Sequence, residues 1–171
     1  SQLAGGAQSG AQSIVDQVGT LSAAGLAAAQ NMISNNPEPL TQAAHDPFEA
    51  RALIYAMLIN EDQEHTSKHQ LALINEHAET GVTPHVTRLL PAVRNSSSEQ
   101  LLMLVEMSVP ALKELSFSQY KTFRKNTADL ITADKRVDIF EWVIHRVLTK
   151  HLHAHFEGPQ NVHGRIGNIH K

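Results

Sequence analysis

The sequence predicts an all-α fold, an array of about seven helices joined by short loops. Helix-start signals recur along the chain, and apolar residues between them follow helical spacing. Strand signals are almost absent, because β-branched runs are short and no Asn-Gly or Asp-Gly pair marks a hairpin. We expect one soluble helical domain over residues 14–156, between a flexible linker at 1–13 and a disordered tail at 157–171.

The N-terminal segment is expected to hold the linker and then helical structure. Residues 1–13 are almost entirely Gly, Ala, Ser and Gln, a composition typical of flexible linkers. Residues 14–34 are Ala-rich with periodic apolar side chains, which predicts one helix or two short ones. The sequence NNPEP at 35–39 predicts a turn.

Three helices are predicted over the middle of the chain. Asp46 can cap a helix with proline in its first turn, and Glu49 would complete a capping box. This helix runs through RALIYAMLI, and the next covers about residues 62–79. Thr83-Pro84 opens a third helix that reaches about Arg94.

Three further helices are each predicted from a capping box. The box at 96–99 precedes QLLMLVEMSV, and Pro110 should kink or break that helix near Met107. Ser116 opens a helix to about Ala133, and Asp138 opens the last one, to about Phe156. The side chains expected in the core are Leu53, Ile54, Met57, Leu73, Leu101, Leu104, Leu112, Phe123, Leu130, Ile131, Ile139, Phe140, Val143 and Leu148.

Composition removes several classes of function. The formal net charge is -3 and no basic stripe is visible along the sequence, so nucleic acid is not an expected partner. No apolar run is long enough to insert directly into a membrane, and no signal peptide is visible. There is no cysteine, which excludes disulfides and thiolate chemistry. Because the chain begins with Ser rather than Met, we expect it to be part of a longer polypeptide.

The eleven histidines suggest metal binding at two places. His65 and His69 have the i, i+4 spacing of zinc ligands, and Asp62 or Glu61 could join them. The zinc-protease motif fails, however, because Thr66 occupies the position of its general base. We interpret this pair as part of a solvated helix face.

The second group of histidines lies at the end of the last predicted helix. His151 and His155 share a helix face there, and protonated histidines interact favourably with the dipole at a helix C-terminus. That interaction explains the pair without a metal. His65, His69, His151 and His155 therefore stay as weak metal candidates.

Other chemical motifs are missing or incomplete. Asp134 and Asp138 flank a turn, but the residues needed later in a calcium loop are Ile139 and His145 instead of Gly and Glu. We expect Asp138 to cap the last helix and Asp134 to support the turn. No nucleophile elbow or Gly-rich phosphate loop occurs. Three large polar-tipped side chains are interpreted as packing or snorkelling residues: Arg51, Tyr55 and Trp142.

Several segments together resemble a known family. They are VDQVGTLSAAGLAAAQNMI, DPFEARALIYAMLIN, HQLALI, LLPAV, VPALKELSFSQYKTFRKN and LITADKRVDIFEWVIHRVLTKHL. This set resembles the C-terminal extension of bacterial membrane-bound zinc metallopeptidases of the HtpX and CAAX-prenyl-protease superfamily, over residues 14–156. The last segment is also similar to a helix pair of tellurite-resistance-type domains, in which an Ala-Asp-x-x-(Val/Ile)-Asp turn joins two helices.

The resemblance implies a parent protein whose catalytic unit lies upstream, with an H-E-x-x-H helix, a later Glu ligand and transmembrane helices. This chain has no H-E-x-x-H, so no catalytic or zinc-binding residue is carried over to it. Zinc is expected in the upstream catalytic domain and no cofactor in this chain. The chain would be a soluble domain facing the cytoplasm from a bacterial inner membrane.

Three hypotheses follow. The first is a non-catalytic accessory domain that regulates the protease or recognises a substrate or partner, with the upstream protease domain itself as one candidate partner. The second is a metal-binding or metal-sensing domain that uses its histidine pairs. The third is a hydrolase with an unrecognised site. The first is favoured because the protease motif is absent and the family resemblance places catalysis elsewhere.

Overall fold

The computed structural model describes residues 36–136 and 138–158. The chain divides by its contacts into two units, Ser1–Asn36 and Pro37–Lys171, and the second is described here. The linker expected at 1–13 and the helical segment expected at 14–34 lie outside the described residues, as does the expected tail beyond residue 158.

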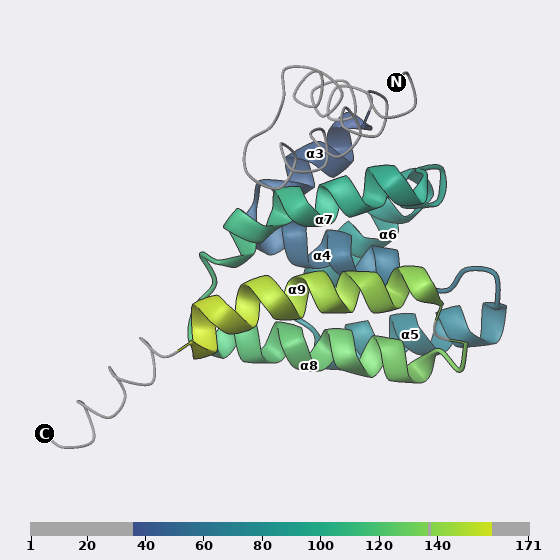
Figure 1. Ribbon diagram of the computed structural model, residues 1–171. Helices are drawn as coiled ribbons and strands as arrows, with labels where there is room; N and C mark the ends of the chain where they lie inside the picture. The colour runs from purple at the N-terminus through teal and green to yellow at the C-terminus, as the bar shows by residue number, and fades with distance from the viewer. Residues whose placement is uncertain (1–35, 137, 159–171) are drawn as a thin grey trace, which may run out of the picture. The chain divides into compact units, whose positions relative to one another are not determined.

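The described residues form seven α-helices and no strand, which confirms the all-α prediction. Figure 1 shows them packed side by side with short connections. They are α3 (Glu38–Ala44), α4 (Pro47–Leu58), α5 (Glu64–His77), α6 (Val82–Arg94), α7 (Ser98–Leu112), α8 (Phe117–Ala133) and α9 (Ile139–Glu157). Six of them match predicted helices, and α3 was not predicted.

Helix α3 occupies part of the segment that was expected to be a turn. Pro37 caps it and a further proline lies in its first turn, where the missing N–H costs no hydrogen bond. A helix of seven residues is marginal on its own. Burial of Leu40, Ala43 and Ala44 against neighbouring helices stabilises it, which the local turn signal could not reveal.

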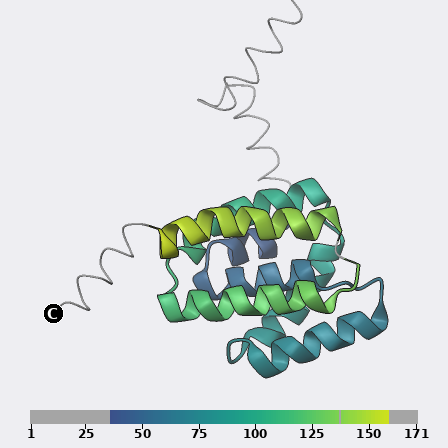
Figure 2. The same ribbon diagram turned by 60° about the horizontal axis from the view of Figure 1, so that its bottom comes forward.

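Helix α4 is the centre of the fold. Every residue from Ala50 to Leu58 is buried, as expected for a helix surrounded on all sides. Helices α3, α6, α7 and α8 all pack against it. Helix α9 runs antiparallel to α8 and also lies along α7, whereas α5 lies against the side of α8 that faces away from α9 (Figure 2).

The predicted helix starts are mostly confirmed. Capping boxes begin α8 at Ser116 and α9 at Asp138, as predicted. The box that begins α7 joins Ser97 and Gln100, one residue later than the predicted box at 96–99. Asp46 caps α4 by accepting two backbone N–H bonds of 2.8 Å. Its expected partner Glu49 is the exception: its carboxylate accepts a 2.6 Å bond from Arg88 instead of closing a box. A cation on α6 therefore competes successfully for that carboxylate.

The break predicted near Met107 is wrong, because α7 continues through Pro110 to Leu112. Proline removes the hydrogen bond to the carbonyl four residues earlier, here Glu106. Both residues lie on the exposed face of α7, where water can satisfy that carbonyl. The proline also stands in the last turn, so few helical bonds depend on it.

The predicted core is largely confirmed. Nine of its residues are buried: Leu53, Ile54, Met57, Leu101, Leu104, Leu112, Phe123, Leu130 and Leu148. Four are half-buried: Leu73, Ile131, Phe140 and Val143.

Ile139 is a wrong prediction, since 82% of its surface is exposed. The buried stripe of α9 follows Ile144, Leu148, Leu152 and Phe156, a four-residue spacing that keeps side chains on one face. The start of α9 is apolar on several faces, so its sequence could not identify the face that packs.

Within the described ranges, none of the helices has the length and apolar character needed to cross a bilayer.

Candidate functional site

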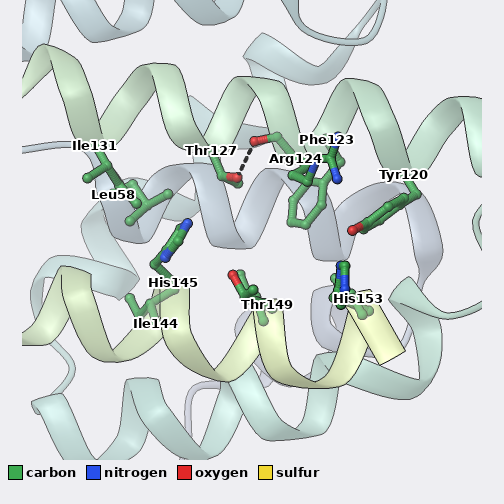
Figure 3. Close-up of a pocket in the computed structure, with 12 residues that line it drawn as sticks. Leu58, Tyr120, Phe123, Arg124, Thr127, Ile131, Ile144, His145, Thr149 and His153 are labelled. Atoms are coloured by element: carbon green, nitrogen blue, oxygen red, sulfur yellow. Dashed lines mark hydrogen bonds between the residues drawn. The ribbon is translucent and has the colours of Figure 1, made fainter. Parts of the chain in front are cut away.

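An apolar hollow lies between α8 and α9, with a volume of about 170 Å³ (Figure 3). Leu58 of α4 and Phe123 of α8 form its floor with Ile144 of α9. Polar tips surround its opening. Its lining residues are Leu58, Tyr120, Phe123, Arg124, Thr127, Ile131, Ile144, His145, Leu148, Thr149, Leu152 and His153. We call this hollow the α8/α9 groove.

Short side chains keep the middle of the groove open. Thr127 of α8 and Thr149 of α9 point into the space between the two helices (Figure 3). The hydroxyl of Thr127 donates a 2.8 Å bond to the carbonyl of Arg124 on its own helix. That bond satisfies the hydroxyl within α8, so the groove needs no polar partner at that point.

One end of the groove is closed by a cluster around Glu157. Its Oε2 accepts hydrogen bonds from Tyr120 Oη at 2.9 Å and from Arg124 Nη1 at 2.8 Å, and it lies 2.9 Å from His153 Nδ1. The ring of Tyr120 stacks on Phe156, with 4.3 Å between centroids. These contacts tie the C-terminal turn of α9 to α8.

The electrostatics of this cluster favour an ionised Glu157. Partial burial raises the pKa of the carboxyl, but hydrogen bonds from Tyr120, His153 and Arg124 outweigh it and hold the pKa below its usual value. Burial and the neighbouring Glu157 raise the pKa of the Tyr120 phenol. Both shifts favour a neutral phenol that donates to a carboxylate.

A second hollow, with a volume of about 310 Å³, lies where α9 begins. Acidic side chains line it, including Glu61, Asp62, Asp134, Asp138 and Glu141, and we call it the acidic cavity. Two of these carboxyls are buried, since Asp134 is only 2% exposed and Glu141 5%.

Hydrogen bonds hold Asp134 in place. Its carboxylate accepts from the backbone N–H of Arg136 at 3.0 Å and from the amide of Asn60 at 3.3 Å. Asn60 is held in turn by Gln70, whose side chain accepts from the Asn60 N–H and donates to the carbonyls of Leu58 and Leu130. The expected support of the turn by Asp134 is confirmed, and the network also joins α4, α5 and α8.

Glu141 keeps its proton near neutral pH. Burial is the main cause, followed by a hydrogen bond to Asp134 and repulsion from Asp134 and Asp138, and together they raise its pKa to about 8. A protonated Glu141 can donate to the Asp134 carboxylate while still accepting from the backbone N–H of Asp138. The two buried carboxyls thus satisfy each other.

A third cluster of buried polar side chains joins α4 to α8 and to the segment that follows α5. Tyr55 donates to Glu79 at 2.9 Å and accepts from the amide of Asn126 at 3.2 Å. Arg51, 4% exposed, lies 3.5 Å from Glu79. Burial and the Glu79 carboxylate raise the pKa of Tyr55 far above its usual value. The packing role predicted for Arg51 and Tyr55 is confirmed, whereas Trp142 is 54% exposed.

The predicted metal candidates are not brought together. His65 and His69 are exposed on α5. His151 lies 3.8 Å from Glu106, and the ring of His155 contacts Phe156 edge-on. Glu61, which was to join the first pair, forms an ion pair with Arg94. Among residues 36–136 and 138–158, no three His, Asp or Glu side chains are grouped as a metal ion would require.

Sequence reasoning missed both hollows. The groove depends on which faces of α8 and α9 oppose each other, and its threonines carry no local signal. The buried Asp134–Glu141 pair had a weak signal, because a capping box following closely on another acid places three carboxyls within eight residues.

Comparison with known proteins adds no relative. No family model matches the chain, and no curated protein or solved structure matches it.

Proposed function

We propose that this chain is a non-catalytic accessory domain that recognises a segment of a protein partner in the α8/α9 groove. The observation that carries the proposal is the groove itself, an apolar floor between two antiparallel helices with polar groups at its opening. Grooves of this kind accept the apolar face of an extended or helical segment, and the polar rim fixes its direction.

The state of the polar groups supports binding rather than catalysis. Among the described residues that line the groove, no hydroxyl is hydrogen-bonded to an imidazole, as an activated nucleophile would be. The perturbed acid Glu141 is engaged with Asp134 and Asp138 at a helix start, where a structural role accounts for it.

The resemblance supplies the wider setting of the proposal. The chain would belong to a membrane-bound zinc metallopeptidase, with the zinc in a separate catalytic domain and this domain facing the cytoplasm. The partner would be the protease domain of the same polypeptide or a substrate presented to it. Either partner could place a segment in the groove.

Filling the groove tests the proposal in the full-length polypeptide. Thr149 is exposed and points into the groove, so Thr149→Trp should block it without disturbing the core. We expect cleavage of protein substrates to change while cleavage of a short generic peptide does not. Thr87→Trp, at an exposed position on α6, is the matched control.

Two results would refute the proposal. One is a full-length polypeptide whose sequence contains no H-E-x-x-H upstream of this chain, because the chain would then not be part of a zinc metallopeptidase. The other is a Thr149→Trp protein that folds normally and cleaves every substrate as the wild type does, because the groove would then have no role in recognition.

A further inference from the structure

Positive charge borders the α8/α9 groove on both sides. Lys121, Arg124 and Lys125 line the outer surface of α8 together with His145 of α9. Arg146 and Lys150 line a hollow on the α9 side. These helices thus bring together five of the 14 Lys and Arg residues of a chain whose net charge is -3.

Acids already pair with two of these five cations, Arg124 and Lys125, so the net positive charge of the border comes from Lys121, Arg146 and Lys150. Glu157 lies at the closed end of the groove and already binds Tyr120 and Arg124. Asp129 forms an ion pair with Lys125, but it lies on the side of α8 that faces Leu73 and His77 of α5. The open length of the groove therefore has a positive border.

Exposed apolar side chains extend the groove towards the start of α9. Trp142 is 54% exposed, and the guanidinium of Arg146 lies 5.2 Å from the centroid of its ring. Trp142 lines a hollow of about 340 Å³ with Arg146, Lys150, His145 and Thr149, and the last two also line the groove. The two hollows therefore adjoin at His145 and Thr149, and Trp142 adds an exposed apolar side chain next to the groove.

We propose that the occupant of the groove is an acidic amphipathic helix from a separate protein, an inference that rests on the proposed function and names the chemistry of the partner. Apolar side chains three and four residues apart would contact the floor formed by Leu58 and Phe123. Acidic side chains flanking them would meet Lys121 and Lys125 on one side and Arg146 and Lys150 on the other.

Charge complementarity argues against the two ends of this chain as occupants. Residues 1–35 carry a single charged side chain, Asp16, and residues 159–171 carry Arg165 and Lys171 without an acid. Neither segment supplies the negative charge that the border requires. A flat anionic bilayer could form ion pairs with the cations that border the groove. It could not reach the apolar side chains at the bottom of a groove between two helices.

Two designed peptides test the inference on the full chain. Both are helices of about 18 residues, five turns, with the same leucine face, and their polar faces are all Glu or all Lys. We expect fluorescence anisotropy to show at least tenfold tighter binding of the acidic peptide. Its affinity should fall as salt is raised from about 0.05 M to about 0.5 M, because salt screens exposed charges.

Charge reversal on each side of the groove then locates the site. Lys121→Glu with Lys125→Glu, and separately Arg146→Glu with Lys150→Glu, should each weaken the acidic peptide at least tenfold and strengthen the basic one. Lys68→Glu on α5 reverses an exposed charge away from the groove and should leave both affinities unchanged. Thermal melts of each variant confirm that it is folded.

The outcomes separate this inference from the function on which it rests. If Thr149→Trp weakens both peptides equally and charge reversal has no effect, the groove binds partners but not by acidity, and the inference is wrong. If neither peptide binds, the inference is wrong, and the proposed function is then decided separately by the effect of Thr149→Trp on cleavage of protein substrates.

Two further measurements can overturn the inference in favour of another occupant. Co-sedimentation with phosphatidylserine vesicles that is lost on charge reversal, without peptide binding, would identify a lipid surface. A concentration-dependent dimer that the acidic peptide dissociates would identify a second copy of this chain.

Discussion

The two hollows beside α9 carry opposite charges. They also differ in whether their charged groups find hydrogen-bond partners within the fold. In the acidic cavity, the buried carboxyls of Asp134 and Glu141 bind each other, the amide of Asn60 and backbone N–H groups. Around the α8/α9 groove, the cations Lys121, Arg146 and Lys150 lie at the surface above an apolar floor.

This difference indicates which hollow is built for a partner. A buried polar group must be satisfied within the fold, because leaving it unpaired costs a few kcal/mol, on the order of 1–3. The acidic cavity meets that requirement internally and needs no ligand. The groove exposes apolar surface and an unbalanced charge, and both are better satisfied by a second molecule.

The largest expected effect is loss of the groove floor. Phe123 is buried and its ring lies 5.6 Å from that of Tyr55, so Phe123→Ala should lower the free energy of unfolding by about 3–5 kcal/mol. Trp142→Ala, at the exposed edge, should change it by no more than about 0.5 kcal/mol. Urea denaturation measures both. If both variants lost the same free energy of unfolding, the floor of the groove would contribute no more to stability than its exposed edge.

The acidic cavity should show a smaller, pH-dependent effect. The folded state holds the Glu141 proton up to about pH 8, whereas the unfolded chain releases it near the usual value of 4.5. The contribution of Glu141 to stability should therefore be fully present at low pH and should be lost as pH rises between these values, by on the order of 2–4 kcal/mol.

Glu141→Gln isolates this contribution. The amide keeps a donor for Asp134 and an acceptor for the backbone but cannot ionise, so the fall in stability between pH 5 and pH 8 should be much smaller than in the wild type. Glu99→Gln, at an exposed position in α7, is the control. A variant that retains the full wild-type slope would show that Glu141 is not the group responsible.

The third effect concerns the start of α9, where Asp138 lines the acidic cavity. The side chain of Asp138 accepts a 2.8 Å bond from the backbone N–H of Glu141. Asp138→Ala should cost about 1 kcal/mol through the lost cap, and Asp138→Asn should restore most of it. A thermal melt of the alanine variant that matches wild type would contradict the placement of this cap.

The smallest effect is expected at the other end of α9, with the opposite sign. The pKa of Glu157 is lowered in the folded state, so its contribution is present above the pKa of the unfolded chain and is lost as pH falls through the folded pKa. Glu157→Gln should cost about 1 kcal/mol or less at pH 7 and nothing at pH 2, because this ion pair is partly exposed. A loss that persists at pH 2 would indicate packing rather than charge.

Much of the architecture could be predicted because its signals are local. Serine at 97 and 116 and aspartate at 46 and 138 accept hydrogen bonds within three residues, so they identify helix starts without knowledge of the fold. The predicted end of α8 at Ala133 was right for the same reason, since the turn residues follow directly.

The candidate site could be predicted only in fragments. The sequence placed Asp134 in a turn and Asp138 at a cap, but it did not reveal the burial that perturbs Glu141. The acidic cavity around Glu141 is also lined by Met57 and Asn60, which lie more than 70 residues earlier in the chain. The sequence placed Tyr55 on an apolar face, but not beside Glu79 and Asn126. It likewise showed no basic stripe, because the cations of α8 and α9 are separated along the chain.

Capping, helical periodicity and composition thus determine the all-α class and the approximate starts of six helices in this protein, since each depends on interactions between residues a few positions apart. Tertiary packing decides that α3 forms, that α7 passes through Pro110 and that Ile139 faces solvent. It also creates the α8/α9 groove and the acidic cavity. These features depend on which helix faces meet, and that is settled by burial across the whole chain rather than by any single segment.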